Sequence, residues 1–299
     1  MTNRWQLYQR ERFPILTYAP LIAAFSFSAV SVSAYLRGQG VPPEARGFLV
    51  AFISVFLFFL QLRIADEFKD HEDDARFRPY RPVPRGLVTL PELGTLSAAA
   101  AVIQLGLALW VKPALAILLI LVWAYLGLMR KEFFVPRWLK AHPVVYLWSH
   151  MAIMPLIALY ASACEWLPAG FMPARALVWF LMASFFNGIV IEIGRKIRIP
   201  EDEEPGVETY SVLWGCRNAV LSWLGAMLLA ATGIWLSAHR IGLAGPVAGW
   251  LAVLMLLALS IAWRFLHGPS KKLAKRVEHM SGLWTLFTYL GLAVASIVG

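Results

Sequence analysis

Residues 47–64 read GFLVAFISVFLFFLQLRI, and residues 65–74 read ADEFKDHEDD. The first run is suited to a helix across a bilayer, which needs about 20 mostly apolar residues. Because the acidic run follows with no Pro or Gly between, we expect the same helix to continue past the bilayer edge. The stretch therefore predicts a membrane helix that carries carboxylates at one membrane surface.

The whole chain shares this apolar character. Of its 299 residues, 59% are hydrophobic and 15% are charged; the mean hydropathy is +0.63, too apolar for an ordinary soluble domain. Nine apolar runs predict an all-α fold of nine transmembrane helices in one integral membrane domain, residues 1–299. The expected spans are residues 14–36, 47–64, 93–111, 113–129, 143–163, 174–193, 219–237, 245–265 and 282–298.

The basic residues predict the orientation of these spans. One side of the membrane, which includes the amino terminus, receives 22 of the 27 Lys and Arg residues. Cytoplasmic loops are rich in these residues, so we expect a cytoplasmic amino terminus and an external carboxyl terminus. The net charge of +9 lies beside membrane spans, which argues against nucleic-acid binding. No organellar targeting segment is recognisable, and this favours a bacterial inner membrane.

Within the acidic run, Asp66, Asp70 and Asp74 are spaced by four residues, and Glu67 lies near the same helix face. Like charges at this spacing destabilise a helix, on the order of a few tenths of a kcal/mol per pair, unless a cation gathers them. Mg²⁺ is commonly held by one or two carboxylates together with substrate phosphates. We therefore expect these four residues to bind Mg²⁺ and to act in catalysis; the alternative is a solvated, charge-rich loop.

The segment that follows, residues 77–86, reads FRPYRPVPRG. Its three prolines make it stiff and extended, which can hold Arg78, Arg81 and Arg85 near the acidic helix end. Guanidinium groups bind diphosphate oxygens through paired hydrogen bonds. Arg78 and Arg81 are therefore candidate diphosphate ligands, although a plain Pro-rich cytoplasmic loop is the competing interpretation.

These two segments resemble the UbiA-type intramembrane prenyltransferases, whose first motif NDxxDxxxD is followed by RPxRP(L/V/I)PxG. Asp66 stands where the family has Asn and Glu67 where it has Asp, whereas Asp70 and Asp74 match. The spacing from Asp74 to Arg81 is similar to that of the chlorophyll-synthase and geranylgeranylglyceryl-phosphate branches. The resemblance implies nine helices around a central cavity, Mg²⁺ as cofactor, and a polyprenyl diphosphate as substrate.

The family's second acidic motif corresponds here to residues 192–210. Asp202, Gly206 and Thr209 match its second half, GDxxxGxxT. Its first half departs from the family, because basic residues stand where aspartates are expected: Arg195, Lys196 and Arg198.

Two interpretations of this second cluster are open. Glu192 with Asp202, or with the neighbouring glutamates, can hold a second Mg²⁺. Alternatively, Arg195, Lys196 and Arg198 can neutralise the phosphates directly as fixed cations. The competing structural interpretation is a charged loop that anchors the sixth span at the membrane surface.

Other polar residues near the spans are weaker candidates. Asn187 lies inside an apolar span and either lines the cavity or forms an interhelical hydrogen bond. Arg130 and Lys131 close the fourth span in a way similar to a family segment whose basic residue contacts diphosphate, but they are also ordinary positive-inside residues. His150, inside the fifth span, is more often a packing residue than a base.

Together these features predict the Mg²⁺-dependent transfer of a polyprenyl group from its diphosphate to an acceptor inside the lipid bilayer. The acceptor is membrane-soluble or interfacial. One alternative is a membrane terpene cyclase that uses the same ionisation of the diphosphate. Another is a non-enzymatic cation transporter or membrane subunit that uses the acidic cluster for metal.

Overall fold

The computed structural model describes residues 3–38 and 44–298, with side chains up to residue 294, and this part of the chain contains helices and turns but no β-strand. Seven of its helical segments are long and apolar enough to cross a membrane. They are α2 (Ile15–Leu36), α3 (Ala45–Lys69), α5 (Leu90–Val111), α8 with α9 (Pro143–Met151 and Ile153–Trp166), α10 (Leu177–Gly194), α11 (Tyr210–Arg240) and α12 (Ala244–His267).

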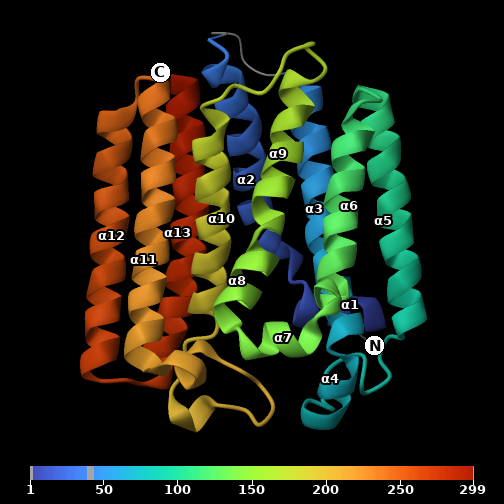
Figure 1. Ribbon diagram of the computed structural model, residues 1–299, viewed down its shortest axis with the longest axis vertical. Helices are drawn as coiled ribbons and strands as arrows, with labels where there is room; N and C mark the ends of the chain where they lie inside the picture. Colours follow the sequence, from blue (N-terminus) through green and yellow to red (C-terminus); the bar gives the residue numbers. More distant parts are fainter. Residues whose placement is uncertain (1–2, 39–43, 299) are drawn as a thin grey trace.

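Two further helices coincide with expected spans. Helix α6, Leu115–Arg130, is apolar and shorter than the others, and it pairs with α5 as a helical hairpin (Figure 1). Helix α13, Lys271–Val298, begins with charged turns and then continues along the length of the bundle (Figure 1).

Three spans differ from the sequence expectation. The span expected at 143–163 is two helices separated at Ala152, because the ring of Pro155 clashes with the carbonyl four residues earlier. Helix α11 begins at Tyr210, well before 219, and its first turn is separated from the rest by Gly215 at φ 78°. Helix α13 begins at Lys271 with charged turns, which an apolar run does not reveal, and the first turn of α11 is separated from the expected span by Gly215, Arg217 and Asn218.

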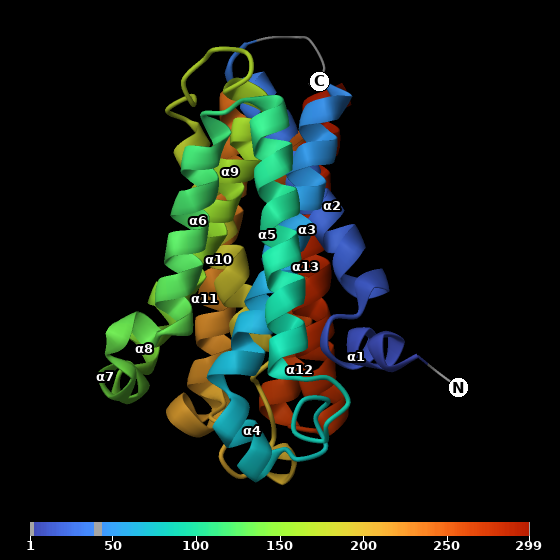
Figure 2. The same cartoon turned by 90° about the vertical axis from the view of Figure 1, so that its right-hand side faces the viewer.

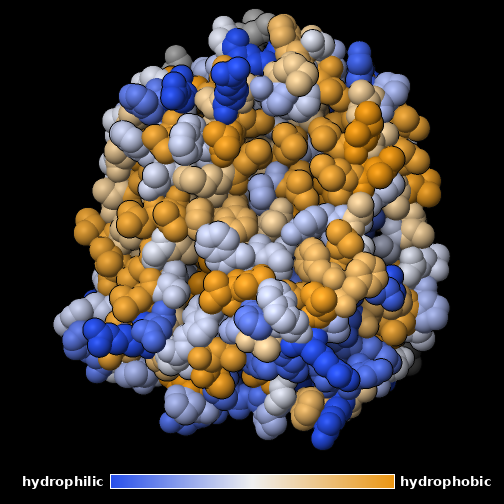
Figure 3. Space-filling view, viewed as in Figure 1, coloured by the Kyte–Doolittle hydropathy of each residue, from blue (hydrophilic) through white to orange (hydrophobic). Residues whose placement is uncertain are grey.

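The long helices stand side by side, with α2, α3, α9, α10 and α13 packed against one another in the middle (Figures 1 and 2). Close packing of α11 on α10 depends on Gly233, since a β-carbon there would lie 2.7 Å from the carbonyl oxygen of Trp179. On the face shown in Figure 3, apolar side chains form a broad band across the middle, and hydrophilic ones gather at both ends. This distribution is that of a protein embedded in a bilayer.

Short helices and loops cover one end of the bundle. They are α1 (Arg4–Arg12), α4 (His71–Phe77), the 3₁₀ turn η1 (Glu132–Phe134), α7 (Pro136–Ala141) and the 3₁₀ turn η2 (Pro200–Asp202). Both acidic clusters found in the sequence lie at this end, which is the lower end in Figure 1. The upper end holds the end of α2, the start of α3, the connection from α9 to α10 and the end of α13.

Candidate functional site

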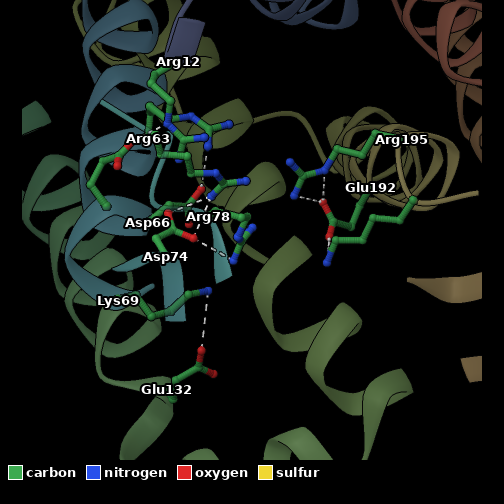
Figure 4. A network of polar contacts seen from close by, with 12 residues as sticks. Arg12, Arg63, Asp66, Lys69, Asp74, Arg78, Glu132, Glu192 and Arg195 are labelled. Carbon is green, nitrogen blue, oxygen red and sulfur yellow. Dashed lines mark hydrogen bonds and ion pairs between the residues drawn. The ribbon is translucent and has the colours of Figure 1, made fainter. Parts of the chain in front are cut away.

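The acidic cluster forms where α3 leaves the apolar part of the bundle. Helix α3 continues to Lys69, as the sequence predicts, and Asp70 then closes it while its backbone turns into α4. Asp66, Asp70 and Asp74 therefore lie on successive turns at one end of the bundle, and the labelled carboxylates of Asp66 and Asp74 lie among several arginines (Figure 4). The predicted side chains are thus brought into one region by the end of a single membrane helix.

Two of the four carboxylates are already neutralised by arginine. Asp74 is 2% exposed, and its oxygens lie 2.7 Å from the guanidinium groups of both Arg78 and Arg81. Glu67, also 2% exposed, is paired with Arg12 of α1. These two acids are therefore well placed to orient arginines, since a buried carboxylate fixes the guanidinium that it binds.

Asp66 and Asp70 have fewer ionic contacts than Asp74 and Glu67. Asp66 has an ion pair with Arg63 at 3.4 Å, and within the described residues no side-chain hydrogen bond or ion pair is found for Asp70. Burial raises the pKa of the Asp70 carboxyl, the charges of Asp66 and Asp74 act in the same direction, and Lys69 opposes them. A second cation beside Asp70 would relieve this unfavourable electrostatic environment.

This donor set fits Mg²⁺ only in company with other ligands. In the described part of the chain, no three His, Cys, Asp or Glu side chains gather in a way that could hold a metal ion by themselves. Mg²⁺ typically takes one or two carboxylates, several waters and substrate phosphates. Asp66 and Asp70 match that pattern, whereas Glu67 and Asp74 are occupied by their arginines.

The proline-rich segment holds its arginines against the acidic helix end. Arg78 and Arg81 both contact Asp74, while Arg85 donates to the Tyr80 carbonyl at 3.0 Å and to Glu11 at 2.9 Å. The Nε of Arg78 is buried and has no hydrogen-bond partner within the described residues. A buried guanidinium N–H without an acceptor is costly, and an anionic ligand would supply the missing acceptor.

The second cluster lies across from the first (Figure 4). Glu192, at the end of α10, accepts hydrogen bonds or ion pairs from Arg195 at 2.5 Å and Lys196 at 3.0 Å. Asp202 is instead paired with Lys271 of α13 at 2.7 Å. The structure therefore does not bring Glu192 and Asp202 together, and each acid has its own basic partner.

The loop of the second cluster packs directly on the first motif. Gly206 has φ 74°, and a β-carbon there would lie 2.5 Å from the Phe77 ring at the end of α4. Tyr80 donates to Glu204 at 3.1 Å, and Arg198 lies 3.4 Å from the same carboxylate. These contacts fix the position of one cluster relative to the other. A site built from two segments requires this.

Three other candidate residues from the sequence are Arg130, Lys131 and Asn187, and they differ in their contacts and exposure. The guanidinium of Arg130 lies 4.3 Å from the ring centre of Phe68, next to Glu67 in α3, and Lys131 is exposed. Asn187 is fully buried and connects α10 to α13: its amide donates to Thr288 at 3.3 Å and its carbonyl accepts from Trp284 at 3.0 Å. Of the two roles considered for Asn187, this geometry is that of the interhelical hydrogen bond.

One group beside the acidic cluster was not anticipated from the sequence. Lys69 donates to the Tyr146 hydroxyl at 2.8 Å and lies 3.5 Å from Glu132, whose other oxygen is 3.6 Å from Nε2 of His150. Glu132 and the two residues after it, Phe133 and Phe134, have left-handed backbone conformations, which are unfavourable for residues other than Gly. The only sequence signal was a lysine placed inside an acidic motif.

Fold and site together define a polytopic α-helical membrane protein with two facing charged clusters at one polar end. A sequence model of the UbiA prenyltransferase family matches residues 24–290. The chain belongs to this family, and it is therefore an enzyme of the prenyltransferase class. Among curated proteins, none matches the chain.

Solved structures with the same fold are distant in sequence. An apo UbiA homologue from Aeropyrum pernix K1 is 16% identical, with a TM-score of 0.69 over 93% of this chain and 97% of that one. A digeranylgeranylglyceryl phosphate synthase is 19% identical, with a TM-score of 0.62 over 95% and 99%. A UbiA homologue from Archaeoglobus fulgidus bound to DMAPP and Mg²⁺ is 14% identical, with a TM-score of 0.56 over 97% and 99%.

Proposed function

We propose that this protein transfers a polyprenyl group from its diphosphate to an acceptor inside the membrane, with Mg²⁺ as cofactor. The observation that carries the proposal is the arrangement around α4. Two weakly paired carboxylates, Asp66 and Asp70, lie beside Arg78 and Arg81, and Arg78 has a buried N–H without an acceptor. Such a set can bind a metal ion and a diphosphate at the same time.

The topology that we infer has nine spans around a central cavity. Seven segments meet the length and composition of a membrane span, and α6 and α13 stand among them in the bundle (Figure 1). The chain begins at the end that holds both charged clusters, and α13 ends at the opposite end (Figure 1). With the distribution of Lys and Arg, this supports a cytoplasmic amino terminus and an external carboxyl terminus.

The diphosphate would lie between the two clusters. Asp66 and Asp70 would hold Mg²⁺, while Glu67 and Asp74 would keep Arg12, Arg78 and Arg81 in place. Further basic residues would complete the neutralisation of the diphosphate: Arg130, Lys131, Arg195, Lys196 and Arg198. Since Glu192 and Asp202 are both paired with bases, we favour direct neutralisation by the second cluster over a second metal ion held there.

When bound, Mg²⁺ supplies positive charge that stabilises the departing diphosphate. Arg78 and Arg81 would hold the same phosphate oxygens as the bond from carbon to oxygen breaks and negative charge accumulates on them. The apolar interior of the bundle excludes water, which would otherwise capture the allylic cation. The acceptor then forms the new bond and releases a proton.

The comparisons support a prenyltransferase that uses Mg²⁺. The family is a family of prenyltransferases, and the Archaeoglobus fulgidus homologue was solved with DMAPP, a prenyl diphosphate, and Mg²⁺. By contrast, no observation favours a cation transporter or a terpene cyclase. The carboxylates cluster at one end of the bundle, whereas a transporter needs them along a path across the membrane.

The mass of the product distinguishes transfer from cyclisation. Membranes that contain the protein should convert isotopically labelled geranylgeranyl diphosphate into a lipid heavier than the prenyl group by the mass of the acceptor. A labelled cyclic hydrocarbon or alcohol, formed equally well in detergent without membrane lipids, would contradict transfer and support the cyclase.

A further inference from the structure

A second charged feature lies at the same end of the bundle, between the second acidic motif and the start of α13. The start of α13 and the loop after α10 line a pocket of about 910 Å³. Six of the lining residues are Lys or Arg and three are Asp or Glu, so the pocket carries an excess of positive charge. Four of the six bases belong to the polar first turns of α13.

The acids in the pocket do not neutralise all of these bases. Each carboxylate has one basic partner: Asp202 with Lys271 at 2.7 Å, Glu204 with Arg198 at 3.4 Å, and Glu278 with Lys275 at 2.8 Å. Lys272 and Arg276 are exposed and have no carboxylate partner within the described residues. They are four residues apart on α13 and therefore share one helix face, where a guanidinium and an ammonium can bind one phosphate group.

The same face of α13 continues into an apolar groove. Lys272, His279, Leu286 and Leu290 follow one another at steps of seven or four residues, which keeps them on one side of the helix. Leu286 and Leu290 line a groove of about 430 Å³ together with apolar residues of α2 and α3. The rise of an α-helix separates His279 from Leu286 by about 10 Å along the axis.

We propose that this face binds an amphiphile with a phosphate monoester head and a hydrocarbon chain. The head would lie on Lys272 and Arg276 in the basic pocket, and the chain would extend toward Leu286 and Leu290. Two features favour this occupant over a soluble anion: the pocket lies at the polar edge of the apolar band, and the groove lies further along the same helix face. The site adjoins the prenyl diphosphate site, since Arg195 and Arg198 also line the basic pocket, but Lys272 and Arg276 belong to neither acidic motif, and binding to them does not depend on prenyl transfer.

The proposal can be tested by binding to the purified full-length protein in a neutral detergent. Native mass spectrometry would compare three probes: a lysophosphatidic acid, the monoacylglycerol with the same chain, and inorganic phosphate. We expect the lysophosphatidic acid to bind at least tenfold more tightly than either of the others, because it alone uses both parts of the site. Equal binding of lysophosphatidic acid and monoacylglycerol would overturn the proposal, and binding of inorganic phosphate as tight as lysophosphatidic acid would leave only an anion site.

Substitutions locate the binding on α13. The double variant Lys272→Gln/Arg276→Gln should lose at least tenfold in affinity for the lysophosphatidic acid, and Lys272→Arg/Arg276→Lys should retain it. The matched control is Arg137→Gln/Lys140→Gln, which removes two exposed bases from α7 at the same end. An unchanged affinity in the first variant, or an equal loss in the control, would refute the assignment. If the first variant did not fold, a second one, Leu286→Gln/Leu290→Gln, would replace it. This variant should bind lysophosphatidic acid more weakly and leave the affinity for inorganic phosphate unchanged, and any other result would refute the assignment.

Discussion

At the residue scale, Asp70 and Asp74 have the same side chain and different surroundings. Asp74 is buried against two guanidinium groups, whereas Asp70 is half-buried beside other carboxylates, a position that raises its pKa. The first arrangement is structural in character, because it orients arginines. The surroundings of Asp70 favour the binding of a cation. Replacing Asp74 and replacing Asp70 should therefore impair the protein in different ways.

Asp74→Ala is expected to destabilise the protein. Removing this carboxylate leaves Arg78 and Arg81 without their shared partner in a buried environment, a change that typically costs about 3–5 kcal/mol. The measurement is the free energy of unfolding in detergent. The neighbouring Asp73 is exposed, and Asp73→Ala should change that free energy by no more than about 0.5 kcal/mol; similar losses in the two variants would contradict the role given to Asp74.

The sequence could predict which residues form the acidic cluster, but not which of them are paired with a basic residue. Spacing by four residues requires only helix geometry, and that geometry is local. The partner of Glu67, in contrast, is Arg12, 55 positions earlier in the chain, and that of Asp202 is Lys271, 69 positions later. Pairings of this kind depend on the tertiary fold, so the division between acids that are paired with arginine and acids that are not appears only in the structure.

At the element scale, the contact between α10 and α11 depends on glycine. A β-carbon on Gly233 would lie 2.7 Å from the backbone oxygen of Trp179 and 2.9 Å from the backbone nitrogen of Ala183. Backbone atoms in the middle of a helix cannot move aside as a flexible side chain can. The helices would therefore have to separate near the start of α10, at the end opposite Glu192.

Gly233→Ala should lower the thermal unfolding temperature of the purified protein, and overpacking of this kind costs about 1–3 kcal/mol. Gly225 lies in the same helix with nothing within 4 Å of an added β-carbon. Gly225→Ala should therefore stabilise the protein slightly, by about 0.5–1 kcal/mol, through helix propensity. Equal unfolding temperatures for the two variants would show that α10 and α11 are not in close contact there.

The apolar spans could be predicted from the sequence because a bilayer requires long apolar helices. The early starts of α11 and α13 could not, since the first turns of α13 are charged, and Gly215, Arg217 and Asn218 interrupt the apolar residues at the start of α11. The left-handed residues at Glu132, Phe133 and Phe134 were also beyond prediction. None is Gly or Asn, so the conformation there must be imposed by surrounding contacts, such as those of Glu132 with Lys69 and Tyr146.

At the scale of the whole molecule, the orientation in the membrane that we propose from the basic residues can be tested by labelling. In a chain with Cys164→Ala and Cys216→Ala, single cysteines would be introduced as Lys140→Cys or Lys112→Cys. Both positions are exposed, and they lie at opposite ends of the bundle. A membrane-impermeant maleimide should label position 112 in intact cells and position 140 only after permeabilisation; the reverse pattern would contradict the orientation.

We propose that Asp66 and Asp70 bind Mg²⁺ for the ionisation of a prenyl diphosphate. The most direct measurement is Mg²⁺-dependent release of pyrophosphate from geranylgeranyl diphosphate by the purified protein. We expect a chelator to abolish release, Asp66→Asn/Asp70→Asn to lower it roughly 100-fold or more, and Asp73→Asn to leave it unchanged. Release at the wild-type rate by the folded double variant, or release that does not need Mg²⁺, would contradict this proposal.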